Sequence, residues 1–314
     1  MPTNAPPLPP TIRVLERGWL SANSIVGFEP DGSATIVDTG YVQHAAQTLA
    51  LVAHLLGERA LRRIVNTHLH SDHCGGNAAL QAAYGGPRQC PIEVPLGELA
   101  AVNDWDEDAL SFRATAQQAA AFTAARGVAP QQRLQIGSLE WIAYPAPGHD
   151  PHALMLFETS GRILISGDSL WRDGFGVIFP ELRGLPGFAA QRETLQRIAA
   201  LRPRCVIPGH GEVFDDVDAA LQRALQRVDA FAADPLRHAR HGLRVLLKFQ
   251  LLQHPQGLPR NQLRGWFAAA PLLAEVGRRF WPGVDSGVLF DDTLEALCRA
   301  GAARADAATI FDAG

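Results

Sequence analysis

Residues 68–73 read His68-Leu69-His70-Ser71-Asp72-His73, which places three imidazoles and one carboxylate within six residues. Side chains of these types, grouped in this way, can bind two neighbouring divalent metal ions. In an extended segment alternate side chains point the same way, so His68 and His70 would face one ion while Asp72 and His73 turn toward the other. The competing interpretation is a histidine-rich loop on the surface.

Three further candidate ligands follow apolar runs later in the chain. They are His149 in Pro147-Gly148-His149, Asp168 in Ser166-Gly167-Asp168 and His210 in Pro208-Gly209-His210-Gly211. If the apolar runs are strands of a shared sheet, their ends bring these side chains to one edge, where loops on a rigid scaffold usually carry functional groups. The sequence therefore predicts a metal site and argues against a mere surface loop.

Short apolar runs rich in β-branched residues alternate with longer helical stretches, which indicates an α/β sandwich rather than a helical bundle. Helices are expected over residues 42–56 and 188–201. One or two more are expected within residues 104–126, either as a lid with Trp105 and Phe112 in its wall or as a solvated packing helix. The expected strands are Ala34–Val37, Ile64–Val65, Trp141–Ala143, Leu154–Phe157, Ile163–Ile165 and Val206–Ile207.

The motifs HxHxDH, PGH, SGD and PGHG occur in this order over roughly residues 11–225, and together they resemble the metallo-β-lactamase fold superfamily. The resemblance implies an αββα sandwich that binds two metal ions. It also implies the ligand assignment: His68, His70 and His149 for the first ion, Asp72, His73 and His210 for the second, and Asp168 as the bridge between them.

Asp38 and Asp72 are the candidate catalytic residues. Asp38, in Val37-Asp38-Thr39-Gly40, matches an acidic residue that the family carries at the end of an early strand. Such a carboxylate can orient a ligand imidazole through its second nitrogen, and a turn cap is the alternative. Asp72 is a candidate proton acceptor or orienting group as well as a ligand.

The ligand types also bear on the metal and its chemistry. Two ions ~3.5–4 Å apart polarise a carbonyl or phosphoryl oxygen and lower the pKa of bound water to ~7. Histidine and carboxylate ligands without cysteine fit zinc first, with iron or manganese as alternatives.

The segment after Asp168 bears on the substrate. Glyoxalase-II-like thioesterases and persulfide dioxygenases of this superfamily usually carry a Gly-Cys-Gly-Arg-type loop there, whereas this chain has Ser169-Leu170-Trp171-Arg172 and no such cysteine. This argues against a glutathione-linked substrate. Candidate substrate contacts are Trp171, Arg172, Phe175, Phe179 and His152; core packing of the aromatic residues and surface roles for Arg172 and His152 are the alternatives.

The chain is expected to divide into an extended tail (1–10), a catalytic domain with a linking helix (11–232) and a mostly helical C-terminal domain (233–314). The last resembles the winged-helix-like extension of some superfamily members, with a wing around Ala302 to Phe311. Residues 236–280 carry eight arginine and lysine residues against the single acid Glu275. These basic helices are expected to shape the pocket mouth, and nucleic-acid contact is the less favoured alternative.

Composition narrows the possible functions further. A formal charge of −4 argues against a general nucleic-acid binder, and no apolar stretch is long enough to cross a membrane. Four widely spaced cysteines, without a recognisable signal peptide, are typical of a cytoplasmic protein.

From the motifs and these exclusions we expect a metal-dependent hydrolase of a small ester, thioester or lactone; the alternatives are a phosphodiesterase or nuclease, and a mononuclear iron dioxygenase. The oligomeric state stays open.

Overall fold

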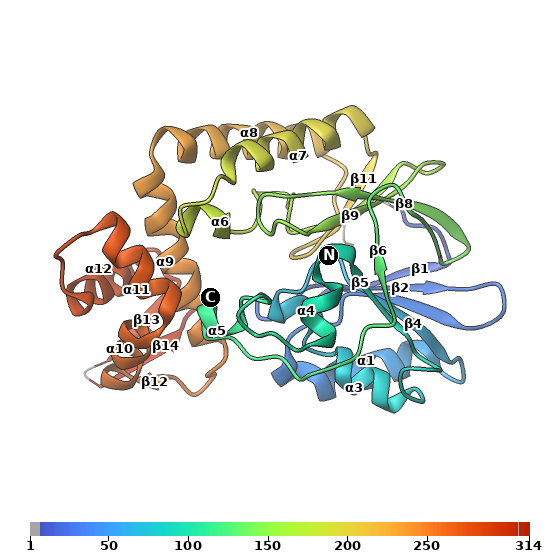
Figure 1. The fold of residues 1–314 in the computed structure, drawn as a ribbon, viewed down its shortest axis with the longest axis horizontal. Helices are drawn as coiled ribbons and strands as arrows, with labels where there is room; N and C mark the ends of the chain where they lie inside the picture. Colours follow the sequence, from blue (N-terminus) through green and yellow to red (C-terminus); the bar gives the residue numbers. More distant parts are fainter. Residues whose placement is uncertain (1–6, 307) are drawn as a thin grey trace.

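The computed structural model describes residues 7–306 and 308–314. Two sheets pack face to face, and helices cover their outer faces, so the predicted αββα sandwich is confirmed (Figure 1). A smaller, mostly helical region follows at the C-terminus. The extended tail expected at residues 1–10 lies mostly outside the described residues.

The two sheets contain all the strands predicted from the sequence. The first has the order β1 (Ile12–Leu15), β2 (Ser24–Phe28), β3 (Ala34–Val37), β4 (Leu61–Val65), β5 (Ile92–Pro95) and β6 (Arg126–Val128). The second has the order β11 (Cys205–Pro208), β10 (Ile163–Gly167), β9 (Leu154–Glu158), β8 (Leu139–Pro145) and β7 (Arg133–Ile136). The pairs β3–β4 and β10–β11 are parallel, so within each pair the carboxyl ends lie at the same edge.

Side chains that alternate along each strand pack either against the helices or between the two sheets, which explains the layered arrangement. In β3, Ile36 packs toward the helices of the first sheet while Val37 packs between the sheets. In β11, Val206 packs toward the helices of the second sheet while Ile207 packs between the sheets. Successive side chains of a strand point to opposite faces, so an apolar residue at every position is what a strand buried on both faces requires.

Helices lie on both outer faces of this core (Figure 1). The first sheet is covered by α1 (Ala45–Leu56) and α3 (Asn77–Ala83), and the second by α7 (Phe188–Leu201) and α8 (Val217–Ala233). Short turns connect the rest: η1 (Val42–His44), α2 (Ser71–Cys74), η2 (Leu96–Glu98), α4 (Leu99–Asn103), α5 (Phe112–Thr115) and α6 (Phe179–Leu182).

Of the one or two helices expected within residues 104–126, the described structure has one, the four-residue α5, so the expected extent of helix is wrong. Ala116 has a φ of 54°, a left-handed conformation that ends the turn. Trp105 and Phe112, expected to face a substrate, pack instead in the core beneath the first sheet, with ring centroids 5.9 Å apart. The high alanine content of this stretch was therefore not sufficient to predict the length of its helix.

The C-terminal region forms an apolar core that also includes Val177 and Leu182 of the sandwich. It comprises α9 (Pro235–Leu252), α10 (Arg260–Ala269), α11 (Pro271–Phe280), α12 (Ser286–Arg299) and a small sheet of β12 (Leu258–Pro259), β14 (Thr309–Asp312) and β13 (Ala303–Ala305). The paired strands β13 and β14 lie where the wing was expected, around residue 307, which is outside the described residues. The winged-helix assignment and the domain limit at 232/233 stay predictions.

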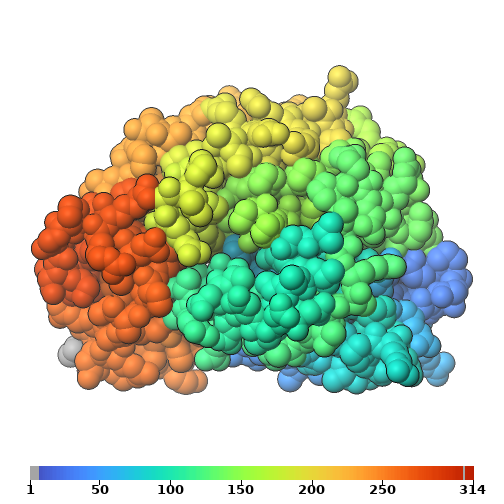
Figure 2. All heavy atoms as spheres, in the orientation of Figure 1, coloured from blue at the N-terminus to red at the C-terminus, as the bar shows by residue number. Residues whose placement is uncertain are grey.

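This region is packed onto the sandwich. Helix α11 contacts α5, and α9 contacts α6, so the orange-to-red C-terminal surface in Figure 2 lies against the teal and yellow segments of the sandwich. None of the described helices combines the length and apolar character needed to cross a membrane.

Candidate metal centre

Loops that follow strands carry the candidate ligands. His68 and His70 follow β4, Asp72 and His73 lie in α2, His149 lies between β8 and β9, Asp168 follows β10, and His210 follows β11. The parallel register of β10 and β11 places Asp168 and His210 at the same edge of their sheet. The sequence pattern of apolar runs leading into polar residues therefore corresponds to real strand ends.

Glycine at position 209 permits the close approach of two of these loops. A Cβ atom on Gly209 would lie 2.2 Å from Oδ1 of Asp168, far inside van der Waals contact. The backbone N–H of Gly209 also donates to the carbonyl of Gly167. Any side chain at 209 would displace the Asp168 carboxylate.

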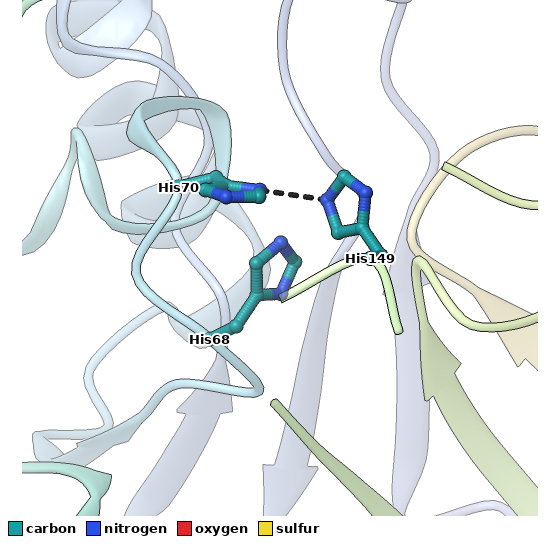
Figure 3. Close-up of side chains that lie close together, drawn as sticks. All are labelled: His68, His70 and His149. Carbon is teal, nitrogen blue, oxygen red and sulfur yellow. Dashed lines mark hydrogen bonds between the residues drawn. The ribbon is translucent and has the colours of Figure 1, made fainter. Parts of the chain in front are cut away.

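His68, His70 and His149 form the first ligand cluster, and their imidazoles converge from both sheets (Figure 3). Nδ1 of His70 and Nε2 of His149 are 2.6 Å apart. One nitrogen atom from each of the three rings lies within 4.8 Å of the other two, a spacing that suits a single ion between them.

The second cluster comprises Asp72, His73, Asp168 and His210. Asp168 lies between the two clusters: its Oδ2 is 3.5 Å from Nε2 of His149, and its Oδ1 is 3.3 Å from Nε2 of His73. One carboxylate oxygen of Asp168 therefore faces an imidazole of each cluster.

Burial controls the charge of the first cluster. Desolvation lowers the pKa of His70 and of His149 to about 4 each. It also lowers the pKa of His68 well below its usual range, and the imidazole of His73 contributes in the same direction. These rings are neutral near pH 7, which is the state in which imidazole binds a metal.

The carboxylates of the second cluster favour a positive charge among them, either on His73 or on a bound cation. Burial by itself would lower the pKa of His73, but Asp168, Asp38 and Asp72 raise it well above its ordinary value. Conversely, burial would raise the pKa of Asp168, yet His73 and His210 hold it well below its usual range. A cation in this cluster would therefore meet a group of carboxylates that are already ionised.

Asp38 lies behind the ligands rather than in the open site. Its Oδ2 accepts hydrogen bonds from Nδ1 of His73 at 2.8 Å and from Oγ1 of Thr67 at 2.7 Å. Oγ1 of Thr67 is in turn 3.0 Å from Nδ1 of His68. Asp38 thus orients one candidate ligand in each cluster, so its placement is that of a positioning residue and not of a catalytic group.

The buried imidazole nitrogens provide a test of whether a metal fits. Nε2 of His68 and Nε2 of His73 are buried and have no hydrogen-bond partner in the described part of the chain. Buried polar atoms are normally satisfied. His68 is a neutral imidazole with an unused lone pair, and a divalent cation can take the place of the proton that the neighbouring carboxylates favour on His73. Imidazole and carboxylate donors of this kind suit divalent transition metals, so the residues present fit two such ions.

The ring of His149 is oriented from a neighbouring loop. Its Nδ1 donates to the carbonyl of Val177 at 2.6 Å, which leaves Nε2 for the cluster. The next residue, Ile178, donates its backbone N–H to Nε2 of His238 on α9 at 3.2 Å. The C-terminal region is thereby connected to a candidate metal ligand through one short loop.

A cavity of about 440 Å³ opens from the two clusters toward α9 and α12. Its metal end includes His70, Asp72, His149, Asp168 and His210, and the remaining wall is mostly apolar. The aromatic and aliphatic residues of this wall are Trp19, Trp171, Val177, Phe179, Val245, Leu246, Phe249, Leu252 and Leu297. The volume lies in the range of small-molecule sites.

Two of the five predicted substrate contacts, Trp171 and Phe179, line this cavity. Phe175 does not: it is fully buried in the core under α8. Arg172 is on the surface, 3.4 Å from Glu212 and 3.5 Å from Asp216. His152 is exposed and is not part of the cavity wall. The sequence of an aromatic-rich loop does not indicate which of its side chains face the cavity.

Trp19, between β1 and β2, is a cavity residue that the sequence analysis missed. It is 56% exposed, yet its ring stacks on His210 with centroids 5.4 Å apart and an interplanar angle of 10°. Trp171 also contacts His210, and its Nε1 donates to Oδ1 of Asp168 at 3.2 Å. On α9, Arg244 and Lys248 line the cavity, as expected of basic helices at the pocket mouth. Val245 and Phe249 were missed, because no local motif marks which face of a helix meets a distant cavity.

Known proteins support this description. A family model described as the metallo-beta-lactamase superfamily matches residues 17–210. The hydroxyacylglutathione hydrolase of Xanthomonas axonopodis pv. citri (strain 306) is 30% identical over 240 residues, covering 72% of this chain and 76% of that protein.

Solved structures show the same fold. A beta-lactamase domain protein from Burkholderia ambifaria has a TM-score of 0.57 and 21% sequence identity, and the match covers 98% of this chain and 94% of that one. TTHA1623, solved in a di-iron-bound form, has a TM-score of 0.53 and 24% identity over 68% of this chain and 98% of its own. The first similarity extends through the C-terminal region.

Proposed function

Because the chain belongs to the metallo-beta-lactamase superfamily and is a metal-dependent hydrolase of that family, we propose that it cleaves a small ester, thioester or lactone. The proposed site holds two divalent ions. His68, His70 and His149 are the proposed ligands of the first ion, and Asp72, His73 and His210 those of the second, with Asp168 shared between them.

The observation that carries this proposal is the position of the Asp168 carboxylate between two complete clusters, at the inner end of a mostly apolar cavity. A mononuclear site needs only one of these clusters. The paired arrangement supports a two-ion hydrolase over a one-iron dioxygenase.

The residues around the site have separate tasks in such a reaction. When bound, two divalent ions supply the positive charge that polarises a carbonyl oxygen and activates water near neutral pH. Asp72, whose Oδ2 lies 3.1 Å from Nε2 of His210, places a carboxylate in the cavity wall that can accept or return a proton. Trp19 and Trp171 provide an apolar face next to His210, which excludes water from the bound acyl group.

The cavity wall supports an acyl substrate. Most of its surface comes from apolar side chains, and α9 supplies much of it through Val245, Leu246 and Phe249. We infer that the C-terminal region shapes the pocket mouth in this way. The relative named hydroxyacylglutathione hydrolase favours a thioester among the three substrate types, while the missing Gly-Cys-Gly-Arg-type loop argues against glutathione as its thiol.

Zinc is the proposed metal. The ligand types fit it, and the di-iron form of TTHA1623 makes iron the principal competitor. Elemental analysis of protein purified without added metal therefore comes first. About two zinc ions per chain, reduced in Asp168→Ala and unchanged in the surface variant His152→Gln, would support the ligand assignment.

Hydrolysis is then tested with a panel of thioesters, esters, lactones and phosphodiesters. We expect thioesters to be cleaved by the wild type and His152→Gln, and Asp168→Ala to lose activity. One iron per chain with oxygen uptake would overturn the proposal in favour of a dioxygenase. Cleavage of phosphodiesters alone would assign the site to a phosphodiesterase.

A further inference from the structure

A second cavity, of about 380 Å³, adjoins the first between α8 and α9. Its wall includes Arg227, Phe231, Arg237, His241 and Arg244. His241 and Arg244 belong to the walls of both cavities. The basic cavity, as we call this second space, is therefore next to the apolar cavity that leads to the metal ligands.

The three arginines of the basic cavity lack acidic partners. None of their guanidinium groups lies within 4.0 Å of a carboxylate in the part of the chain that the structure describes. Some basic residues of the C-terminal region are paired, such as Arg260 with Asp291 at 2.8 Å, and Lys248 with Asp312. Among the described residues, arginines without such a partner also occur elsewhere in this region, at Arg240, Arg278, Arg279 and Arg304, but Arg227, Arg237 and Arg244 line the wall of the same cavity.

Arg227 is held in place before any ligand binds. Its guanidinium carbon lies 5.6 Å from the ring centroid of Phe175 and 5.4 Å from that of Phe231. It donates to Nε2 of His241 at 2.9 Å and to the carbonyl of Asp173 at 3.3 Å. Burial, followed by the charges of two other arginines, lowers the pKa of Arg227, so an anion would relieve an existing repulsion.

We propose that the basic cavity binds a phosphate group of the substrate while the substrate's acyl part occupies the apolar cavity. Three guanidinium groups match a multiply charged anion, and their planar forks suit phosphate oxygens. A single carboxylate would leave at least one of the three charges unpaired. This inference rests on the proposed hydrolase activity and narrows it to acyl esters or thioesters of a phosphate-bearing small molecule.

Binding of inorganic phosphate tests the site without turnover. Calorimetric titration should show binding that weakens at least ~10-fold in Arg237→Gln and in Arg244→Gln, because each removes a charge-assisted contact. Arg240→Gln is the matched control, since Arg240 is exposed on the same helix but outside both cavities. Arg237 is also exposed, and unchanged thermal unfolding of its variant would separate binding from folding.

Equal phosphate affinity in all three variants would overturn the proposal. So would binding that these substitutions leave intact but a chelator abolishes, because the phosphate would then be bound by the metal ions. Competition by single-stranded RNA, with the steep salt dependence of backbone binding, would reassign the arginines to nucleic acid and also overturn it.

A matched pair of thioesters completes the test. With the same acyl group, a phosphate-bearing thiol part should give a KM at least ~10-fold lower than an uncharged one, and Arg237→Gln should remove this difference. If neither thioester is cleaved although phosphate binding depends on the arginines, the hydrolase proposal fails and the anion site stands. If both are cleaved equally well, the anion site fails and the hydrolase stands.

Discussion

Nε2 of His238 accepts a hydrogen bond from the backbone N–H of Ile178 at 3.2 Å, and this bond connects the C-terminal region to the metal centre. The residue before Ile178 is Val177, whose carbonyl accepts from Nδ1 of His149 at 2.6 Å. Helix α9 therefore fixes the loop that orients one candidate ligand. Partners of this kind strongly influence metal affinity.

Replacing His238 with phenylalanine should destabilise the protein and loosen the metal site. The ring volume is kept, but the buried N–H of Ile178 loses its acceptor, which costs about 1–3 kcal/mol. Urea unfolding and metal content measure the two effects. His54→Gln, at an exposed position on α1, is the control; equal stability of the two variants would contradict the structural role of His238.

The same residue should make stability depend on pH. Burial, assisted by the charge of Arg227, lowers the pKa of His238 to about 4 from an ordinary value of 6.5. Between about pH 4 and pH 6.5 the unfolded chain binds a proton at His238 that the folded chain does not. The stability that His238 contributes to the folded state is therefore complete above about pH 6.5 and is lost as the pH falls toward 4.

His238→Gln tests this, because glutamine can still accept from Ile178 but does not titrate. Between about pH 7.5 and pH 5, the free energy of unfolding should shift by about 2 kcal/mol in favour of the variant relative to the wild type. Denaturant unfolding at several pH values measures the difference. A difference that stays constant with pH would show that folding does not lower the pKa of His238.

Asp38→Asn should weaken metal binding while preserving the fold. Asparagine has the same shape and tolerates the left-handed φ of 57° found at this position, but it removes the negative charge next to Nδ1 of His73. We expect the affinity for zinc to fall about 10–100-fold, measured by competition with a chelating dye. Asp215→Asn, an exposed position, should bind zinc like the wild type.

Trp19→Ala should raise KM without affecting folding. Trp19 is 56% exposed and therefore adds little to the core, while its ring forms the cavity wall beside His210. A lost aromatic contact of about 0.5–1.5 kcal/mol corresponds to a KM about 2–10-fold higher. Leu185→Ala, at a position 57% exposed and away from the cavity, is the matched control for steady-state kinetics.

The sequence predicted the sandwich and the grouping of the candidate ligands well, for physical reasons. Strands such as β11 are apolar at successive positions because both of their faces are buried, and the residue that ends such a strand is fixed in space by the sheet. His210 therefore reaches the site from far along the chain, and the apolar strand followed by its Pro-Gly-His-Gly motif was enough to predict it.

Side chains in loops and on helix surfaces were harder to predict. Phe175 and Phe179 lie in one aromatic loop, yet the first is core and the second is cavity wall. The helix expected over residues 104–126 was too long, because the alanines of residues 116–125 favour a helix locally, whereas these residues have no regular secondary structure before β6. Thr115 and Gln117 from this stretch nevertheless line the cavity. Arg244 depends on how α9 packs, which only the tertiary structure determines.

The stacking of Trp19 on His210, with Trp171 at its edge, gives the protein an intrinsic optical reporter. Indole emission responds to charge and to ring contacts, and only six tryptophans contribute to the total signal of this chain. Binding of the proposed second ion at His210, and of the proposed acyl substrate against Trp19, should therefore change the fluorescence of the unlabelled protein and can be followed in real time.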